Sequence, residues 1–300
     1  LIMFEKIRSL IFKFDPETAH DLAIKALKTN MIPFKEKSYD CLKVKFLGKE
    51  IPNPIGIAAG FDKNAEVYNP LFKLGFGFVE VGTVTPEPQF GNPKPRVFRL
   101  EEDEALINRL GFNNIGSNKV SLNIKKDLPQ GLLGINIGPN KDTKNRIDDY
   151  LKCIRSLNNL GDYITINISS PNTDNLRSFH NPNELEKLLK LIQEEKNKLK
   201  SSINIAVKVA PDIEINNLDN IGNILLNGLG DAKQNKKHGY KLLSDASNNN
   251  FGLASLSLAK YLKDTNRCGQ AISFYQKAKG QGIKNLEQTI ADLSFECSEN

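Results

Sequence analysis

The sequence predicts an α/β protein of the (β/α) TIM-barrel type that is incomplete, with about five β/α units, an N-terminal helical hairpin and an all-helical C-terminal tail. Three observations predict this class. Short apolar runs alternate with longer amphipathic runs, the short runs are apolar on both faces, and a polar residue stands at or after the end of each. Strands apolar on both faces are typical of a parallel sheet covered by helices. Polar residues at strand ends favour a barrel, whose active site is built at that end.

The first forty residues predict two amphipathic helices. Apolar residues recur at helical spacing from Phe4 to Phe14, and a second helix begins at Pro16, with Asp15 as its capping residue and Glu17 at the positive end of the helix dipole. Docking on a core is the commoner use of such apolar stripes, and a hairpin lying on a membrane surface is the alternative. The stripe of the second helix comprises Ala19, Leu22, Ala23, Ala26 and Leu27.

Five apolar runs are predicted as strands, namely residues 54–59, 78–84, 132–137, 163–168 and 204–209. Between several of them we expect amphipathic helices, most clearly at 142–160 and 182–199. In a barrel the strand ends converge on one mouth, where amides and ammonium groups suit a flat, anionic, imide-bearing ligand. The polar residues at these ends are Lys63, Thr83, Asn136, Asn167 and Lys208.

Composition and charge exclude several other classes. With 39% hydrophobic and 25% charged residues the chain is globular. It contains no run of about 20 apolar residues, so no membrane-spanning helix is predicted.

The N-terminal segment lacks the features of a secretory signal, so we expect it to be retained. Four cysteines lie far apart without a CxxC pair, which predicts reduced thiols, no disulfide and no metal site. The net charge is +6, but basic and acidic residues are interspersed along the chain, so nucleic acid is not an expected partner. A basic amphipathic N-terminal end that binds anionic lipid accounts for the excess of positive charge more locally.

Six segments resemble the dihydroorotate dehydrogenase family, in the family's order and at its approximate spacing. They are AAGFDKN (58–64), VEVGTVTP (79–86), INRLGFNN (107–114), GINIGPNK (134–141), INISSPNTDNLR (166–177) and VKVAPD (207–212). In addition, FDPETAH (14–20) is similar to the membrane-associated, quinone-dependent class. The resemblance covers roughly residues 3–218. It implies oxidation of dihydroorotate to orotate in pyrimidine biosynthesis, with FMN as hydride acceptor and a membrane quinone as final electron acceptor, at the cytoplasmic, inner face of the cell membrane.

The same resemblance implies roles for individual residues. Ser170 matches the catalytic base that takes a proton from C5 of dihydroorotate, and a serine there indicates the quinone class. Because a neutral hydroxyl is a poor base, it must pass the proton onward, through water. The residues that match substrate contacts are Lys63, Asn108, Arg109, Leu110, Gly111, Phe112, Asn167 and Asn172. Those that match FMN contacts are Ala59, Gly60, Lys63, Thr83, Asn136, Asn167 and Lys208.

Two lysines have implied electrostatic roles in this scheme. The cation of Lys63 balances the orotate carboxylate, and Lys208 stands near N1 and O2 of the flavin, where negative charge develops on reduction. His20 and His180 are assigned no part in the chemistry, and no metal is implied.

The motif that contains Lys208 is the last one, and the resemblance ends at about residue 218. The family continues with three more strand and helix units, whose loops hold the FMN phosphate, whereas residues 213–300 predict helices. The segments 240–247, 254–262 and 271–280 resemble a Sel1-like or tetratricopeptide-type repeat, and an amphipathic tail without repeat ancestry is the alternative. Ala254, Ala259, Ala271 and Ala278 permit close approach of the helices.

The sequence therefore predicts three parts: a hairpin at 1–40 on the membrane and quinone side, a partial barrel at 41–218 with the FMN and orotate motifs, and a helical tail at 219–300. Three functions stay open. The chain is an active quinone-dependent enzyme, a catalytically inactive truncated or fused relic of it, or a helical-repeat interaction protein whose tail binds a protein partner.

Overall fold

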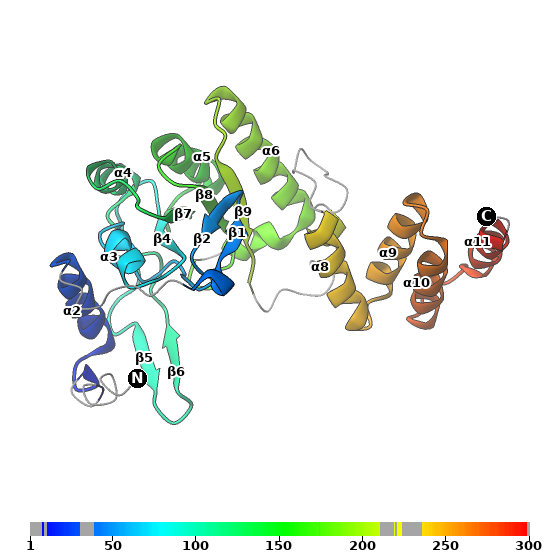
Figure 1. Cartoon of the computed structure of the whole chain (residues 1–300), viewed down its shortest axis with the longest axis horizontal. Coiled ribbons are helices and arrows are strands. Elements are labelled where there is room, and N and C mark those ends of the chain that lie inside the picture. Colours follow the sequence, from blue (N-terminus) through cyan, green and yellow to red (C-terminus); the bar gives the residue numbers. More distant parts are fainter. Residues whose placement is uncertain are drawn as a thin grey trace. The chain divides into compact units, whose positions relative to one another are not determined.

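The computed structural model describes residues 8, 11–30, 39–173, 175–210, 219, 221–223 and 236–298 (Figure 1). The chain forms two compact units. The first comprises Leu1–Arg177 and Glu194–Val209, and the second comprises Ser178–Gln193 and Ala210–Asn300. The three-part organisation expected from the sequence stays a prediction.

A five-stranded parallel sheet forms the centre of the first unit. Each strand lies within one of the five ranges that the apolar runs predict, so the barrel-type α/β prediction is confirmed. Within the described residues, the first and last of these strands are the sheet's edges. In chain order, which is also their order in the sheet, they are β3 (Gly56–Ile57), β4 (Phe78–Val84), β7 (Leu132–Ile137), β8 (Tyr163–Asn167) and β9 (Asn204–Lys208).

The central strands β7 and β8 are buried along their whole length, which is why their sequences are apolar on both faces. The helices that follow the strands supply the cover. Helix α5 is shorter than the predicted 142–160, because the side chain of Asn145 caps it by accepting from the N–H of Asp148 at 3.2 Å. These helices are α3 (Tyr68–Lys73), α4 (Ser117–Lys126) and α5 (Arg146–Leu157), and a further helix, α6 (Pro182–Lys198), follows β8 and is divided between the two units.

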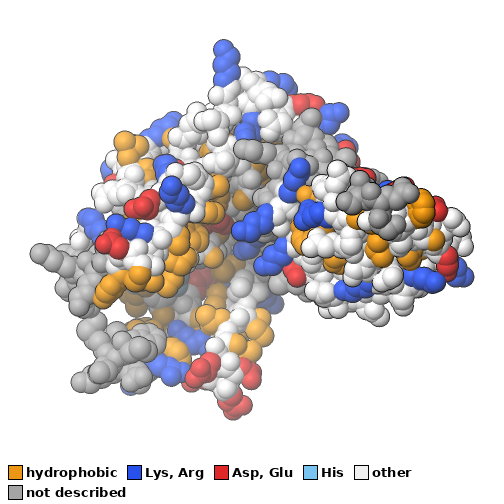
Figure 2. Space-filling view, turned by 45° about the vertical axis from the view of Figure 1, so that its right-hand side comes forward, with side chains coloured by type: hydrophobic (Ala, Val, Ile, Leu, Met, Phe, Trp, Pro, Cys, Tyr) orange, Lys and Arg blue, Asp and Glu red, His pale blue; other side chains and the backbone are white. Residues whose placement is uncertain are grey.

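Two antiparallel hairpins were not predicted. One joins β1 (Val44–Phe46) to β2 (Lys49–Ile51), and the other joins β5 (Val97–Leu100) to β6 (Ala105–Asn108). The second hairpin has an acidic tip at residues 101–104, seen as red side chains at the lower edge of Figure 2, with hydrophobic side chains along its strands above. Its strands leave apolar side chains exposed, so this hairpin is an extension of the unit rather than part of its core.

Helix α2 (Pro16–Lys28) begins where the sequence predicts. Asp15 Oδ1 accepts from the N–H groups of Glu17 and Thr18, at 3.0 and 3.1 Å. Most of its apolar stripe is not buried, since Leu22 is 46% exposed and Ala23 and Ala26 are exposed as well, so the interpretation of a stripe docked on a core is wrong for these positions. No described helix has the length and the apolar run needed to cross a bilayer. The predicted helix at 4–14 lies largely outside the described residues.

Contacts of polar side chains attach α2 to the first unit. The guanidinium of Arg96 donates to both carboxylate oxygens of Glu17, at 2.6 and 3.1 Å, and both side chains are buried. His20 Nε2 donates to the backbone carbonyl of Phe61 at 2.7 Å. The helix is therefore held by its polar face.

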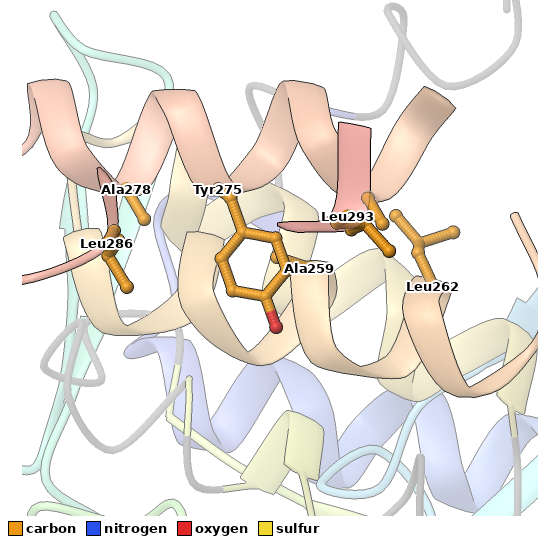
Figure 3. Close-up of a cluster of buried hydrophobic side chains, with 7 residues drawn as sticks. Ala259, Leu262, Tyr275, Ala278, Leu286 and Leu293 are labelled. Atoms are coloured by element: carbon orange, nitrogen blue, oxygen red, sulfur yellow. The ribbon is translucent and has the colours of Figure 1, made fainter. Parts of the chain in front are cut away.

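The second unit contains α8 (Lys236–Asn248), α9 (Gly252–Asp264), α10 (Cys268–Gly280) and α11 (Glu287–Ser298). The prediction of a helical tail is confirmed, and its repeat ancestry stays a prediction. The four alanines expected at helix contacts are all fully buried. Figure 3 shows the ring of Tyr275 beside Ala259, with Leu262 and Leu293 to one side and Ala278 and Leu286 to the other.

One cysteine prediction is wrong. Cys268 and Cys297 form a disulfide between the first turn of α10 and the last turn of α11, with their Cα atoms 5.9 Å apart. Cys41 and Cys153 are free, as expected. The partners are 29 residues apart in sequence, and only the packing of two helices brings them together. No spacing motif encodes such a pair.

Replacing Cys297 with Ser is expected to destabilise the packing of α11 on α10 by about 3–4 kcal/mol, because the disulfide closes a loop of 29 residues in the unfolded chain. Faster amide hydrogen exchange in α11 of the full chain would report this loss. A reductant added to the native sequence should act in the same direction. Replacing the exposed Cys41 with Ser is the control and should leave exchange in α11 unchanged. Equal exchange with and without reductant would contradict the prediction.

Candidate functional site

Three polar side chains meet at the carboxyl ends of β4, β7 and β8. Thr83 Oγ1 donates to Asn136 Oδ1 at 2.6 Å, and Asn167 Nδ2 donates to both of these oxygens at 3.1 Å. All three residues are buried, with exposed fractions of 8%, 0% and 4% in chain order. We call these three residues the strand-end cluster. The sequence predicted their convergence, because neighbouring parallel strands bring their carboxyl ends to one edge.

A carboxylate that the sequence analysis did not single out lies next to the strand-end cluster. Glu80 Oε1 accepts from Asn136 Nδ2 at 2.7 Å, while Glu80 Oε2 accepts from the hydroxyls of Tyr163 and Thr165, at 3.0 and 2.9 Å. Burial, reinforced by the Glu80 carboxylate, raises the pKa of Tyr163 far above its ordinary value, so the phenol stays protonated and donates. The available signal was a single charged residue within an otherwise apolar strand.

The serine turn after β8 is attached to the strand-end cluster. Asn167 Oδ1 accepts from the N–H and the hydroxyl of Ser169, at 3.1 and 2.7 Å. The next residue, Ser170, is half-buried, and its Oγ accepts from the N–H of Asn172 at 3.2 Å. Asn172 Nδ2 in turn donates to the backbone carbonyl of Asn108 at 3.5 Å. The structure thus groups Ser170, Asn172 and Asn108 beside the cluster.

The loop at residues 109–112 is held by Gln89, which the sequence analysis also missed. Gln89 Nε2 donates to the carbonyls of Gly111 and Phe112, at 3.0 and 3.1 Å. Its Oε1 accepts from Asn140 Nδ2 and from the N–H of Lys141, at 2.9 and 3.0 Å. One side chain therefore joins this loop to the loop that follows β7.

Gln89 stabilises an unusual backbone in this loop. Gly111 and Phe112 both have left-handed backbones, with φ of 72° and 55°, a conformation that costs energy at Phe112. This backbone brings the ring of Phe112 close to Thr83 of the strand-end cluster, with Gly138 beside both side chains. A Cβ added to Gly138 would lie 2.9 Å from Phe112 Cε2 and 2.9 Å from Thr83 Cγ2. Glycine at 138 makes this close approach possible.

Arg109 contacts the β5–β6 hairpin and the loop before it, and Leu110 contacts that loop. The guanidinium of Arg109 donates to the carbonyl of Pro95, at 2.9 Å from Nη2 and 3.2 Å from Nε, and lies 5.7 Å from the centre of the Phe98 ring. The carbonyl of Leu110 accepts from the N–H of Asn92 at 3.0 Å. The structure therefore directs the guanidinium of Arg109 away from the strand-end cluster, and Leu110 contacts the loop before β5 through its backbone.

The loop after β3 contributes backbone to the site. The N–H of Gly60, which follows Ala59, donates to the carbonyl of Gly82 at 2.8 Å, directly before Thr83. Gly60 has a φ of 114°, and no atom lies within 4 Å of the place a Cβ would take. This conformation favours glycine and leaves open space over the peptide, which is what close approach of a ligand requires.

The two predicted lysines lie in different surroundings. Lys63 lines a cavity of about 340 Å³ together with Glu17, His20 and Ile24 of α2. Burial lowers the pKa of Lys63, and the nearby carboxylates of Glu17 and Asp21 only partly oppose this. Lys208 is exposed on β9, directly opposite Asn167 in the parallel register.

Comparison with known proteins identifies relatives of the chain. The family model for dihydroorotate dehydrogenase matches residues 41–231. The dihydroorotate dehydrogenase (quinone) of Nitrosomonas europaea is 44% identical over 241 residues, which are 77% of this chain and 70% of that protein. The enzyme of the same name from Bartonella tribocorum is 49% identical over 218 residues, which are 71% of this chain and 61% of that protein.

Solved structures that resemble the chain belong to the same family. The ligand-free DHODH of Eimeria tenella is 32% identical, with a TM-score of 0.69 over 82% of this chain and 87% of that one. The ferulenol complex of the same protein has a TM-score of 0.68 over 82% of this chain and 84% of that one. The strand-end cluster and the serine turn both lie inside the range that the family model matches.

Proposed function

The chain belongs to the dihydroorotate dehydrogenase family, and from this membership we propose that it oxidises dihydroorotate to orotate, with a quinone as the final electron acceptor, as a step of pyrimidine biosynthesis. One observation carries the proposal. The hydrogen-bonded cluster of Thr83, Asn136 and Asn167 is joined through Ser169 to the turn that holds Ser170. Removal of a hydride and a proton from a flat anion needs polar groups that hold the anion and a hydroxyl next to it that takes the proton. The strand-end cluster and Ser170 provide these groups.

The donor set fits FMN. Two amides and a hydroxyl at three strand ends, beside the open peptide of Gly60, offer donors and acceptors to a flat ring with an imide edge. A bound FMN supplies the ring that accepts the hydride from C6. The described residues do not include loops after a seventh and eighth strand, where barrels hold phosphate, so retention of FMN is the most informative measurement. The residues that would hold it are Ala59, Gly60, Lys63, Thr83, Asn136, Asn167 and Lys208.

The chain's own residues bind the substrate and move its proton. The half-buried cation of Lys63 pairs with the substrate carboxylate. The amides of Asn108, Asn167 and Asn172 meet the amide edges of the pyrimidine. Ser170 Oγ receives the proton from C5 and passes it to water, and the bond from the Asn172 N–H keeps the hydroxyl in place.

We assign membrane attachment, and with it access to the quinone, to α2, whose apolar stripe is exposed at Leu22. A helix with such a face can lie on a lipid surface, at the inner face of the cell membrane. Deleting residues 1–33 is therefore expected to abolish sedimentation of the protein with anionic vesicles. Sedimentation at the level of the full chain would contradict peripheral membrane binding through this segment.

The test of the function is spectroscopic. The purified chain, supplied with FMN, is expected to retain a yellow chromophore through gel filtration, and anaerobic dihydroorotate should bleach it. Re-addition of a short-chain quinone should restore the colour. Failure to bind FMN present in excess would make the chain an inactive relative of the enzyme.

A second candidate function rests on the helical part of the second unit. Helices α8 to α11 form their own buried clusters and carry a disulfide, so they pack as a helical module whose surface is available to bind a protein partner. Capture of a partner that is lost when surface residues of α9 and α10 are changed, in a chain that neither binds FMN nor oxidises dihydroorotate, would favour this function.

Replacing Gln89 with Leu is expected to raise the KM for dihydroorotate about tenfold or more, because two carbonyls of the loop at 109–112 lose their donor. Binding of FMN should change little, since Gln89 does not contact the strand-end cluster. Steady-state kinetics and flavin titration check the two parts. Replacing the exposed Lys141, whose side chain contacts Asn92, with Met is the matched control and should leave KM within about twofold. An equal effect of both variants would contradict the prediction.

A further inference from the structure

Glu80 is a carboxylate inside the first unit with no role in the scheme above. It comes from the middle of β4, and all three of its partners lie on β7 and β8. The carboxylate accepts one hydrogen bond on Oε1, from Asn136, and two on Oε2, from Tyr163 and Thr165. Three donors from two other strands thus converge on one side chain.

The backbone is shaped for this convergence. Gly134 of β7 lies between Glu80 and Tyr163 in the register of the sheet. A Cβ on Gly134 would lie 2.2 Å from Cζ and 2.4 Å from the hydroxyl oxygen of Tyr163. The tyrosine ring therefore crosses β7 where that strand has no side chain, and its hydroxyl reaches Glu80 on the far side.

A carboxylate can only accept hydrogen bonds, which fixes the direction of the network. The side-chain amide of Asn136 must present its NH₂ group to Glu80, so its oxygen faces the other way. That oxygen accepts from Thr83 and from the NH₂ group of Asn167. The oxygen of Asn167 is then left to accept from the N–H and the hydroxyl of Ser169.

We propose that Glu80 is a positioning residue of the active site, whose carboxylate sets the orientation of the Asn136 amide and, through it, that of Asn167 and the turn bearing Ser170. The orientation of the amides follows from the chain alone. Its consequence for FMN and for proton transfer rests on the proposed function.

The first test needs no ligand. Asparagine side chains are labelled with ¹⁵N in the full chain, the Asn136 signal is assigned by its loss in Asn136→Asp, and exchange of its NH₂ protons is measured. Glu80→Leu is expected to accelerate this exchange about tenfold or more, because the acceptor is gone. Glu80→Gln should stay within about threefold of the native rate, since its oxygen can face Asn136 while its NH₂ group donates to the two hydroxyls.

Tyr163→Phe is the matched control. It removes one bond to Glu80 and leaves the bond between Glu80 and Asn136, so exchange at Asn136 should stay within about threefold. Native exchange rates at Asn136 in a folded Glu80→Leu variant would overturn the proposal. So would equal acceleration in Glu80→Leu and Tyr163→Phe, which would indicate general loosening.

A charge exchange keeps the proposal testable if Glu80→Leu does not fold. Asn136→Asp places two acceptors opposite each other and should lower the unfolding midpoint, whereas Glu80→Gln combined with Asn136→Asp restores a donor opposite an acceptor and should recover most of the loss. A double variant no more stable than Asn136→Asp would overturn the directional link.

The functional readout is separate. In a chain that binds FMN, Glu80→Leu should weaken FMN binding about tenfold, and Glu80→Gln should restore it to within about threefold. If the native chain binds no FMN, the proposed function fails while the exchange measurements still decide the role of Glu80. If FMN binds equally to the native and Leu forms, the positioning role is overturned and the proposed function stands.

Discussion

Replacing Ser170 with Ala is expected to slow dihydroorotate-dependent flavin reduction by about 10²–10⁴-fold, the usual contribution of a positioned general base. The hydroxyl is half-buried beside the strand-end cluster, and its Oγ accepts a hydrogen bond from the N–H of Asn172, a bond that does not use the hydroxyl's own proton. Flavin binding should be unchanged, since the cluster of Thr83, Asn136 and Asn167 does not depend on Ser170. Anaerobic stopped-flow absorbance measures the rate, and flavin titration measures the affinity.

Ser169→Ala is the matched control for this experiment. It removes the hydroxyl bond to Asn167 Oδ1 but keeps the backbone bond to the same oxygen, so the rate is expected to fall about tenfold or less. Equal rates for the two alanine variants would remove Ser170 from the role of base and leave the turn with a purely structural part.

Replacing Arg96 with Met is expected to lower the free energy of unfolding by about 3–5 kcal/mol, because it leaves the buried Glu17 carboxylate without its main partner. Arg96 also donates to the carbonyls of Phe90 and Asn92, so the loop that holds Gln89 should loosen together with α2. Urea unfolding of the full chain measures the loss, and faster hydrogen exchange in α2 locates it. Lys94→Met is the control: Lys94 is 63% exposed and 3.5 Å from Glu17, so its loss should cost about 1 kcal/mol or less.

The same pair predicts a dependence of stability on pH. The hydrogen bonds and charge of Arg96 hold the pKa of Glu17 below its ordinary value of 4.5. The stabilisation is therefore complete above about pH 4.5 and is lost as the pH falls through the lower pKa of the folded state. Glu17→Gln should flatten this part of the stability profile. An acid limb as steep in Glu17→Gln as in the native chain would contradict the assignment.

Much of the fold could be predicted because buried segments have a recognisable pattern of apolar residues in the sequence. Strands such as β7 are apolar on both faces, and the asparagine in that strand stands out against Leu and Ile. Parallel pairing of sequential strands then brings Asn136 and Asn167 together without any knowledge of loops. Asp15 and Pro16 likewise define the start of α2 by local chemistry alone.

The parts that could not be predicted depend on contacts between distant segments. Gln89 is one amide in a polar loop, and its function exists only because the loop at 109–112 folds back over it. Glu80 draws attention by its charge, but its partners become evident only from the register of three strands. The pair of Cys268 and Cys297 depends on how α11 packs on α10. Arg109 resembles a substrate contact, yet the fold directs its guanidinium to the carbonyl of Pro95.

The crossing of Tyr163 over Gly134 has a consequence for how this sequence can diverge. Gly134 does not have the left-handed backbone that usually explains a glycine, so a comparison of single positions would rate it as replaceable by alanine. The tyrosine on the neighbouring strand forbids that change, because a methyl group would overlap its ring. The two positions are therefore coupled: a side chain at 134 requires a smaller side chain at 163, and that change in turn removes a donor from Glu80. Substitution at any of these three sites, which are distant in the chain, therefore depends on the other two.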